Sequence, residues 1–127
     1  MTDQTPSITF KQFSDANKLR SLTAFGHDVT DQAAPGAWTN DQWMTAITGE
    51  LGEAASALKA INRRQLAKDM HVTPRDVAVE LADMVTYADL LCTQLGFDLG
   101  QIVAEKFNEV SVRVSSDVRL PEASDHD

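Results

Sequence analysis

Apolar residues recur every three or four positions along most of this chain, and no run of useful length alternates with a period of two. The first pattern is typical of amphipathic helices and the second of strands. Residues suited to begin or end a helix punctuate the pattern, namely Thr39, Thr73 and Asp98 at starts and Gly26 and Gly96 at ends. The sequence therefore predicts helices at about residues 9–25, 40–62, 74–95 and 99–114.

Four helices that each carry an apolar stripe can bury these stripes by packing against one another. We therefore expect an all-α protein with the architecture of a four-helix bundle. A chain of 127 residues suits a single domain, which we place at residues 1–114. The polar, acidic tail at residues 115–127 is expected to be disordered or draped on a neighbouring subunit.

The overall charge narrows the range of partners. The net charge of −8 argues against a nucleic-acid or anionic-membrane partner, since both require an excess of Lys and Arg. No apolar run is long enough to span a membrane, and the first residues lack the pattern of a signal peptide. With Cys92 as the one cysteine, we expect a cytoplasmic protein.

Two pairs of carboxylates stand out within the apolar runs. Glu50 and Glu53 lie three residues apart in the second predicted helix, and Glu80 and Asp83 lie three residues apart in the third. We expect the second helix to pack through a stripe centred on Ile47, Leu51 and Leu58, and the third through one centred on Leu81, Ala88 and Leu95. Each pair lies to one side of its apolar stripe, in the same rotational sense. If the two helices pack stripe to stripe and run antiparallel, all four carboxylates converge on one side of the pair.

Converging carboxylates repel one another, and a divalent cation removes that repulsion. Hard oxygen ligands suit Mg²⁺, with Mn²⁺ as a substitute. The competing interpretation of each pair is a solvated acidic helix face. Di-iron chemistry would require Glu-x-x-His pairs, and neither pair contains a histidine.

The run ITGELGEAASALKA, followed by VAVELADMVTYADLLCTQLGFDLGQIVAEKFNEVSVR, resembles the MazG-like, all-α nucleoside triphosphate pyrophosphohydrolases over roughly residues 38–113. The resemblance implies hydrolysis between the α and β phosphorus, giving a monophosphate and pyrophosphate, often to clear unwanted nucleotides. It implies Mg²⁺ held by Glu50, Glu53, Glu80 and Asp83, and oligomers in which a neighbouring subunit completes the site. Gly49 stands where many members carry a further Glu, so Glu50 and Glu53 both remain candidates for the catalytic base.

Further residues are candidates for binding the substrate. In the resemblance, Lys106 and Arg113 lie near the phosphates; the alternative is a pair of solvated cations. Asn108 can hydrogen-bond the sugar or base. Lys59 can steer phosphates or simply complement the helix dipole.

Aromatic residues near the carboxylate pairs are candidates for contacts with the base. Trp38, in the loop before the second helix, is placed to stack on a nucleobase, whereas Trp43 lies on the apolar stripe and is expected in the core. Tyr87 follows Asp83 by one turn, and its hydroxyl is expected to reach a carboxylate.

Together, the carboxylate pairs and the resemblance predict a Mg²⁺-dependent enzyme that hydrolyses nucleoside triphosphates. The wide apolar stripes also predict a homodimer or a dimer of dimers. Two rival interpretations keep the fold without the reaction: a nucleotide-binding or regulatory module, and a structural helical adaptor.

Overall fold

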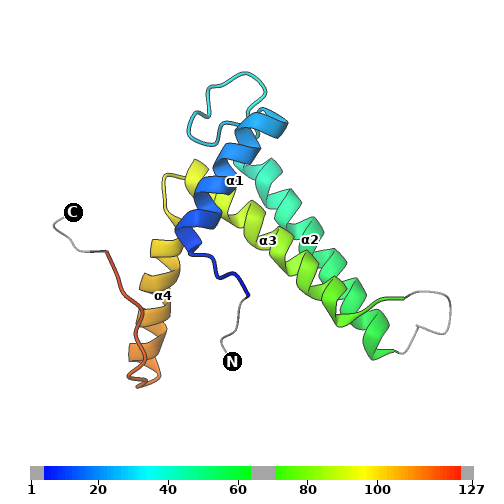
Figure 1. The fold of residues 1–127 in the computed structure, drawn as a ribbon, viewed down its shortest axis with the longest axis vertical. Coiled ribbons are helices and arrows are strands. Elements are labelled where there is room, and N and C mark those ends of the chain that lie inside the picture. Colours follow the sequence, from blue (N-terminus) through cyan, green and yellow to red (C-terminus); the bar gives the residue numbers. More distant parts are fainter. Residues whose placement is uncertain (1–4, 64–70, 124–127) are drawn as a thin grey trace.

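The computed structural model describes residues 5–63 and 71–123. In that part of the chain it contains four helices and no strand: α1 (Phe10–Phe25), α2 (Asn40–Asn62), α3 (Pro74–Gln94) and α4 (Leu99–Arg113) (Figure 1). The prediction of an all-α fold with four helices is confirmed, and each helix end lies within one residue of its predicted position.

Local capping explains why the helix ends could be predicted. At the start of α2, the backbone N–H of Gln42 donates to Thr39 Oγ1 at 3.2 Å, and the backbone N–H of Thr39 donates to Gln42 Oε1 at 2.8 Å. Asp98 accepts from the backbone N–H of Gln101 at the start of α4. Gly26 ends α1 in the left-handed conformation, with φ 73°.

Helices α2 and α3 form an antiparallel hairpin, which is the main packing contact of the fold (Figure 1). Along each helix the less exposed residues include a series spaced by three and four, which we call the α2–α3 seam. On α2 it comprises Trp43, Ile47, Glu50, Ala54, Ala57 and Ile61; on α3 it comprises Val77, Glu80, Met84, Tyr87, Leu91 and Gln94. This spacing is that of helices packed nearly along one another.

The seam corrects the expected orientation of the two helices. We expected Leu51, Leu58 and Leu81 to face the partner helix, but each of these side chains is about half exposed. Glu50 and Glu80 instead occupy seam positions themselves. The hairpin thus places small residues and carboxylates between its helices and leaves several large apolar residues on an outer face.

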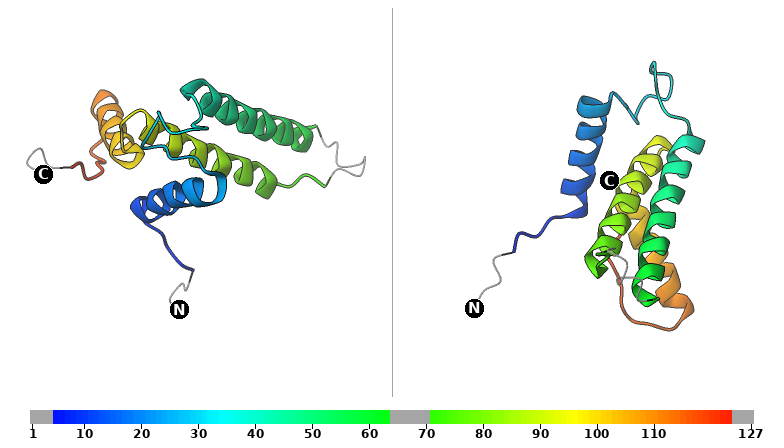
Figure 2. Two further views of the ribbon diagram at one scale, coloured as in Figure 1. Left: turned by 90° about the horizontal axis from the view of Figure 1, so that it is seen from above. Right: turned by 90° about the vertical axis from the view of Figure 1, so that its right-hand side faces the viewer.

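Helix α1 attaches to α3 through polar contacts, on the side of α3 opposite α2 (Figure 2). The buried residues of α1 are Ser14, Asn17 and Ser21. Ser14 Oγ donates to Asp89 Oδ1 at 2.9 Å, and Asn17 Nδ2 donates to Asp89 Oδ2 at 3.0 Å. Asp89 is fully buried, so this carboxylate fixes the position of α1.

Helix α4 points away from the hairpin, and the chain that follows it turns back beside it (Figure 1). Asn108 joins the two: its Nδ2 donates to the carbonyl of Leu120, and its Oδ1 accepts from the backbone N–H of Leu120, both at 2.8 Å. The described part of the tail, residues 114–123, therefore lies against its own chain.

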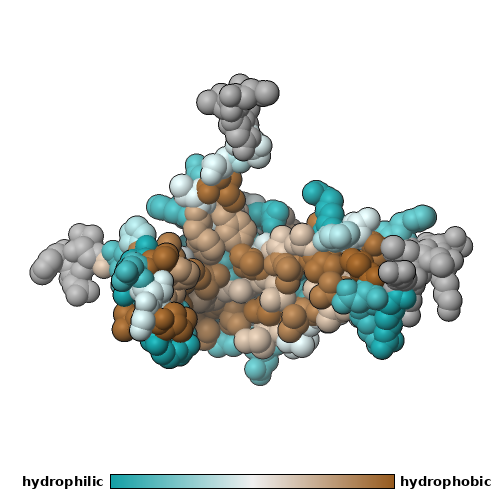
Figure 3. Space-filling view, turned by 90° about the horizontal axis from the view of Figure 1, so that it is seen from below, coloured by the Kyte–Doolittle hydropathy of each residue, from teal (hydrophilic) through white to brown (hydrophobic). Residues whose placement is uncertain are grey.

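Large apolar side chains remain exposed on every helix. On the face shown in Figure 3, hydrophobic surface extends over much of the molecule. Despite this, no helix in the described ranges is both long and apolar enough to cross a membrane.

Candidate functional site

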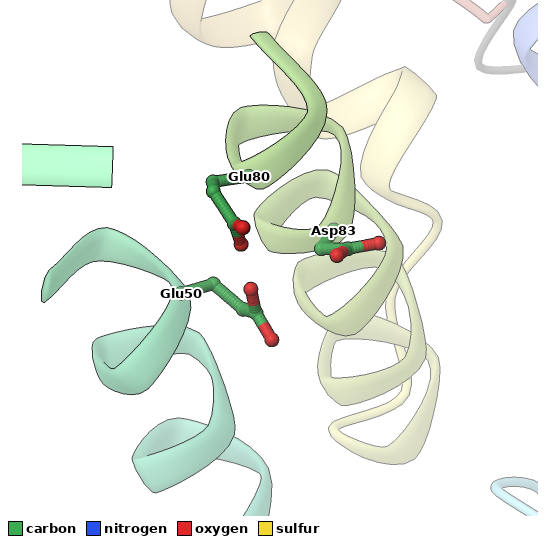
Figure 4. Close-up of side chains that lie close together, drawn as sticks. All are labelled: Glu50, Glu80 and Asp83. Atoms are coloured by element: carbon green, nitrogen blue, oxygen red, sulfur yellow. The ribbon is translucent and has the colours of Figure 1, made fainter. Parts of the chain in front are cut away.

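Three carboxylates converge at the middle of the α2–α3 seam. Glu50 of α2 and Glu80 of α3 point toward each other, with Asp83 one turn further along α3 (Figure 4). One oxygen from each of these three residues lies within 4.8 Å of the others. Three of the four carboxylates that we expected to converge therefore do so, and we call these three residues the carboxylate cluster.

The electrostatics of the carboxylate cluster are unfavourable for three charged groups. Glu80, as a hydrogen-bonding neighbour and a like charge, raises the pKa of Glu53. Glu50 raises the pKa of Glu80 for the same reasons. Glu53 therefore lies close to the cluster, on its exposed side, although it is not one of the three converging residues.

No cation of the protein neutralises these charges within the described ranges. The ion pairs found there, Lys11–Asp15 and Lys106–Glu109, both lie elsewhere. Glu50 Oε2 is buried and has no hydrogen-bond partner among the described residues. Since a buried carboxylate oxygen normally has a partner, this atom is left available to a ligand.

A cavity of about 280 Å³ opens beside the carboxylate cluster. Its aromatic wall comes from the loop before α2, from α2 and from α3, and it includes His27, Trp38, Trp43 and Tyr87. The ring centroids of Trp38 and Trp43 lie 4.6 Å apart, and those of His27 and Trp38 lie 4.8 Å apart. The opposite wall is formed by α1, through Asn17, Arg20, Ser21 and Phe25.

Gln94, at the end of α3, holds the aromatic wall in place. Its Oε1 accepts from Trp43 Nε1 at 3.0 Å, and its Nε2 donates to the carbonyl of Trp38 at 2.9 Å. As expected, Trp43 belongs to the core, with 2% of its surface exposed. The roles of Gln94, Asn17 and His27 were not predicted from the sequence. Gln94 and Asn17 could have been found as polar residues at buried positions of their helices.

Asp83 belongs to both the carboxylate cluster and the aromatic cavity. It is one of the three converging carboxylates, and it also lines the aromatic cavity together with Thr86 and Tyr87. A ligand in the cavity therefore has one end among aromatic rings and the other next to the carboxylate cluster.

The remaining predicted substrate residues lie away from the cavity in a single chain. Lys106 pairs with Glu109 on the exposed side of α4 at 2.9 Å, and Arg113 is exposed in the last turn of that helix. Asn108 is buried against the chain's own tail, and Lys59 is exposed in the last turn of α2. Of the six predicted substrate-binding residues, Trp38 and Tyr87 line the cavity and these four do not.

Comparisons with protein-family models, with curated proteins and with solved structures find no match to this chain.

Proposed function

We propose that this protein is a Mg²⁺-dependent nucleoside triphosphate pyrophosphohydrolase that converts a triphosphate to a monophosphate and pyrophosphate. The observation that carries the proposal is the position of Asp83, which is shared by the carboxylate cluster and the aromatic cavity. A nucleotide has the matching polarity, with a planar base at one end and phosphates that bind cations at the other.

The residues of the cluster suit Mg²⁺. All the donors are carboxylate oxygens, no described Lys or Arg forms an ion pair with them, and Glu50 Oε2 is buried without a partner. Glu50, Glu80 and Asp83 would hold the ion, with Glu53 in reach of it. When bound, Mg²⁺ neutralises phosphate charge and lowers the pKa of coordinated water.

The protein's own residues position the substrate and accept a proton. The base stacks on the exposed part of Trp38, whose ring packs against Trp43, and Trp43 in turn packs against Tyr87. Water attacks the α phosphorus, the bond from that phosphorus to the bridging oxygen breaks, and pyrophosphate leaves. Glu53 takes the proton of the attacking water, because it is exposed and lies beside the carboxylates that would hold the ion.

The phosphates also need cations, and among the described residues Arg20 is the one Lys or Arg that lines the cavity. We propose that Lys106 and Arg113 reach the site of a neighbouring subunit, as the resemblance to the MazG-like enzymes implies. In this proposal the bundle of that family is completed by the assembly, which accounts for the small contact between α4 and its own hairpin.

The experiment that tests the proposal is a screen for pyrophosphate release from canonical and modified nucleoside triphosphates, with Mg²⁺ and with chelator. We expect metal-dependent release with the monophosphate as the second product. Binding of nucleotides without release would instead identify a non-catalytic nucleotide-binding module, and release of inorganic phosphate would contradict the proposed bond cleavage.

Substitution of the proposed base gives a sharper test. Glu53→Gln removes the proton acceptor and keeps the size of the side chain, so we expect kcat to fall by about 100-fold or more with an unchanged circular dichroism spectrum. Glu105→Gln, an equivalent change at an exposed position of α4, is the matched control and should leave kcat unchanged. Full activity of Glu53→Gln would refute the assigned role.

A further inference from the structure

Arg20 lies on the wall of the aromatic cavity that α1 forms, and among the described residues it is the one Lys or Arg in that lining. Its side chain forms no ion pair or hydrogen bond with another described residue. Arg20 is also exposed. A side chain that lines a cavity and is exposed lies at its mouth, so the guanidinium is free to contact a ligand that enters.

The backbone around Arg20 is held on both sides by buried hydrogen bonds. Asn17, one turn before it, donates through Nδ2 to Asp89 Oδ2 at 3.0 Å. Ser21, the next residue, donates through Oγ to the carbonyl of His27 at 3.1 Å. Residues three and four positions apart share one face of a helix, so these bonds keep the face that carries Arg20 turned toward the cavity.

The charges near the cavity are otherwise mainly negative. Asp83 lines it, and Glu50 and Glu80 lie with Asp83 in the carboxylate cluster. An anionic group that enters the cavity is repelled by these carboxylates, and Arg20 opposes that repulsion. A guanidinium also matches a phosphate in shape, because its N–H groups form a fork that can bind two oxygens at once.

We infer that Arg20 binds the phosphate attached to the sugar of the nucleotide, which is the α phosphate of a triphosphate and the one phosphate of the product. This inference rests on the proposed function, which places the base against Trp38 in the cavity. The α phosphate lies next to the nucleoside, so a residue of the cavity wall meets it before the β and γ phosphates. Arg20 contacts it from α1, whereas the carboxylate cluster lies on the hairpin.

Binding of nucleosides and their monophosphates tests the assignment without any hydrolysis. Isothermal titration in Mg²⁺, with the four common nucleosides and the monophosphate of each, gives a pair of dissociation constants for every base. We expect Arg20→Gln to weaken binding of the monophosphates by about tenfold or more and to leave binding of the nucleosides unchanged, because only the monophosphates carry the group that Arg20 binds.

Two further variants control for general effects of charge. Arg75→Gln removes an exposed arginine of α3 that does not line the cavity, and it should bind both ligands as the wild type does. Arg20→Lys keeps the charge but not the fork, and it should retain part of the affinity for the monophosphate. A loss in Arg20→Gln that is equal for nucleoside and monophosphate would show that Arg20 only shapes the cavity and would overturn the inference.

Triphosphate analogues with a methylene group between the α and β phosphorus distinguish the α phosphate from the other two. These analogues cannot be cleaved at the proposed bond, so their binding can be measured in Mg²⁺. We expect Arg20→Gln to weaken binding of the analogue and of the monophosphate by the same factor. A loss confined to the analogue would place Arg20 at the β or γ phosphate and overturn the assignment.

The inference and the proposed reaction can fail separately. Weakened monophosphate binding by Arg20→Gln, in a protein that releases no pyrophosphate from any triphosphate, would support the inference and refute the reaction. Unchanged monophosphate binding by Arg20→Gln, in a protein that does release pyrophosphate, would overturn the inference and leave the reaction standing. A wild type that binds neither nucleosides nor monophosphates at millimolar concentration would contradict both.

Discussion

At the scale of single residues, the most informative feature is the presence of Glu50 and Glu80 at seam positions between two helices. Such positions normally hold apolar side chains, because carboxylates lose hydration there and repel one another. The raised pKa values of Glu53 and Glu80 record that repulsion. This repulsion destabilises the folded protein, and a bound cation would remove it.

The pH dependence of stability follows from the direction of these shifts. A carboxyl group whose pKa is raised in the folded state stabilises the fold when it is protonated. This contribution is complete below the ordinary carboxyl pKa of about 4.5, and it is lost as the pH rises through the raised pKa. We therefore expect Mg²⁺ to raise the melting temperature strongly at pH 7.5 and little near pH 4.5, where protons occupy the cluster.

Melting curves with Mg²⁺ and with chelator across this pH range measure the effect. Glu80→Gln serves as the comparison: it should melt at a higher temperature than the wild type without metal at pH 7.5 and respond less to Mg²⁺. A response to Mg²⁺ that is constant with pH would contradict the proposed metal site.

At the scale of the elements, α1 is attached unlike the other helices. Its buried residues are Ser14, Asn17 and Ser21, while Leu19, Leu22 and Phe25 are largely exposed. Hydrogen bonds to Asp89 therefore set its position on α3, and α1 in turn supplies one wall of the cavity. The placement of a helix by a few buried polar contacts makes the cavity sensitive to a single residue.

Asp89→Ala tests this attachment. Two donors, Ser14 Oγ and Asn17 Nδ2, would lose a buried acceptor, and we expect the free energy of unfolding to fall by about 1–3 kcal/mol. Hydrogen exchange should show the loss of protection concentrated in α1. Asp117→Ala, at an exposed position of the tail, is the control, and equal effects of the two changes would exclude the role given to Asp89.

At the scale of the whole molecule, the chain leaves more apolar surface exposed than a small monomer usually does. Leu51, Leu58 and Leu81 lie on the outside of the hairpin at 51%, 48% and 45% exposure, and α4 has apolar residues exposed as well. A second copy of the chain is the simplest cover for such a surface. The same association would allow α4 of one copy to approach the site of another.

We predict that the protein sediments as a dimer or a dimer of dimers at micromolar concentration. Leu58→Asp places a charge on the outer apolar face and should shift the sedimentation toward the monomer. Ser56→Asp adds the same charge at an exposed polar position of α2 and should leave the assembly intact. A wild-type protein that is monomeric under these conditions would contradict the prediction.

Local patterns in the sequence determined the helices and their ends, because capping residues and apolar periodicity act within a few residues of the chain. The helix ends require no knowledge of which distant side chains meet. The acidic residues of α2 and α3 were predicted to converge because antiparallel helices bring equal offsets to one side, but that prediction placed all four of them beside a seam through Leu51 and Leu81. Glu50, Glu80 and Asp83 do converge, with Glu50 and Glu80 in the seam itself.

Only the tertiary structure decided how each helix is rotated about its axis. The periodicity of α2 could not distinguish a seam through Leu51 from one through Glu50, because both series have helical spacing and the choice depends on how side chains of two helices fit together. The cavity, the attachment of α1 by Asp89 and the use of Gln94 to hold Trp38 and Trp43 join residues distant in the sequence. Such contacts depend on long-range packing, which no local pattern encodes.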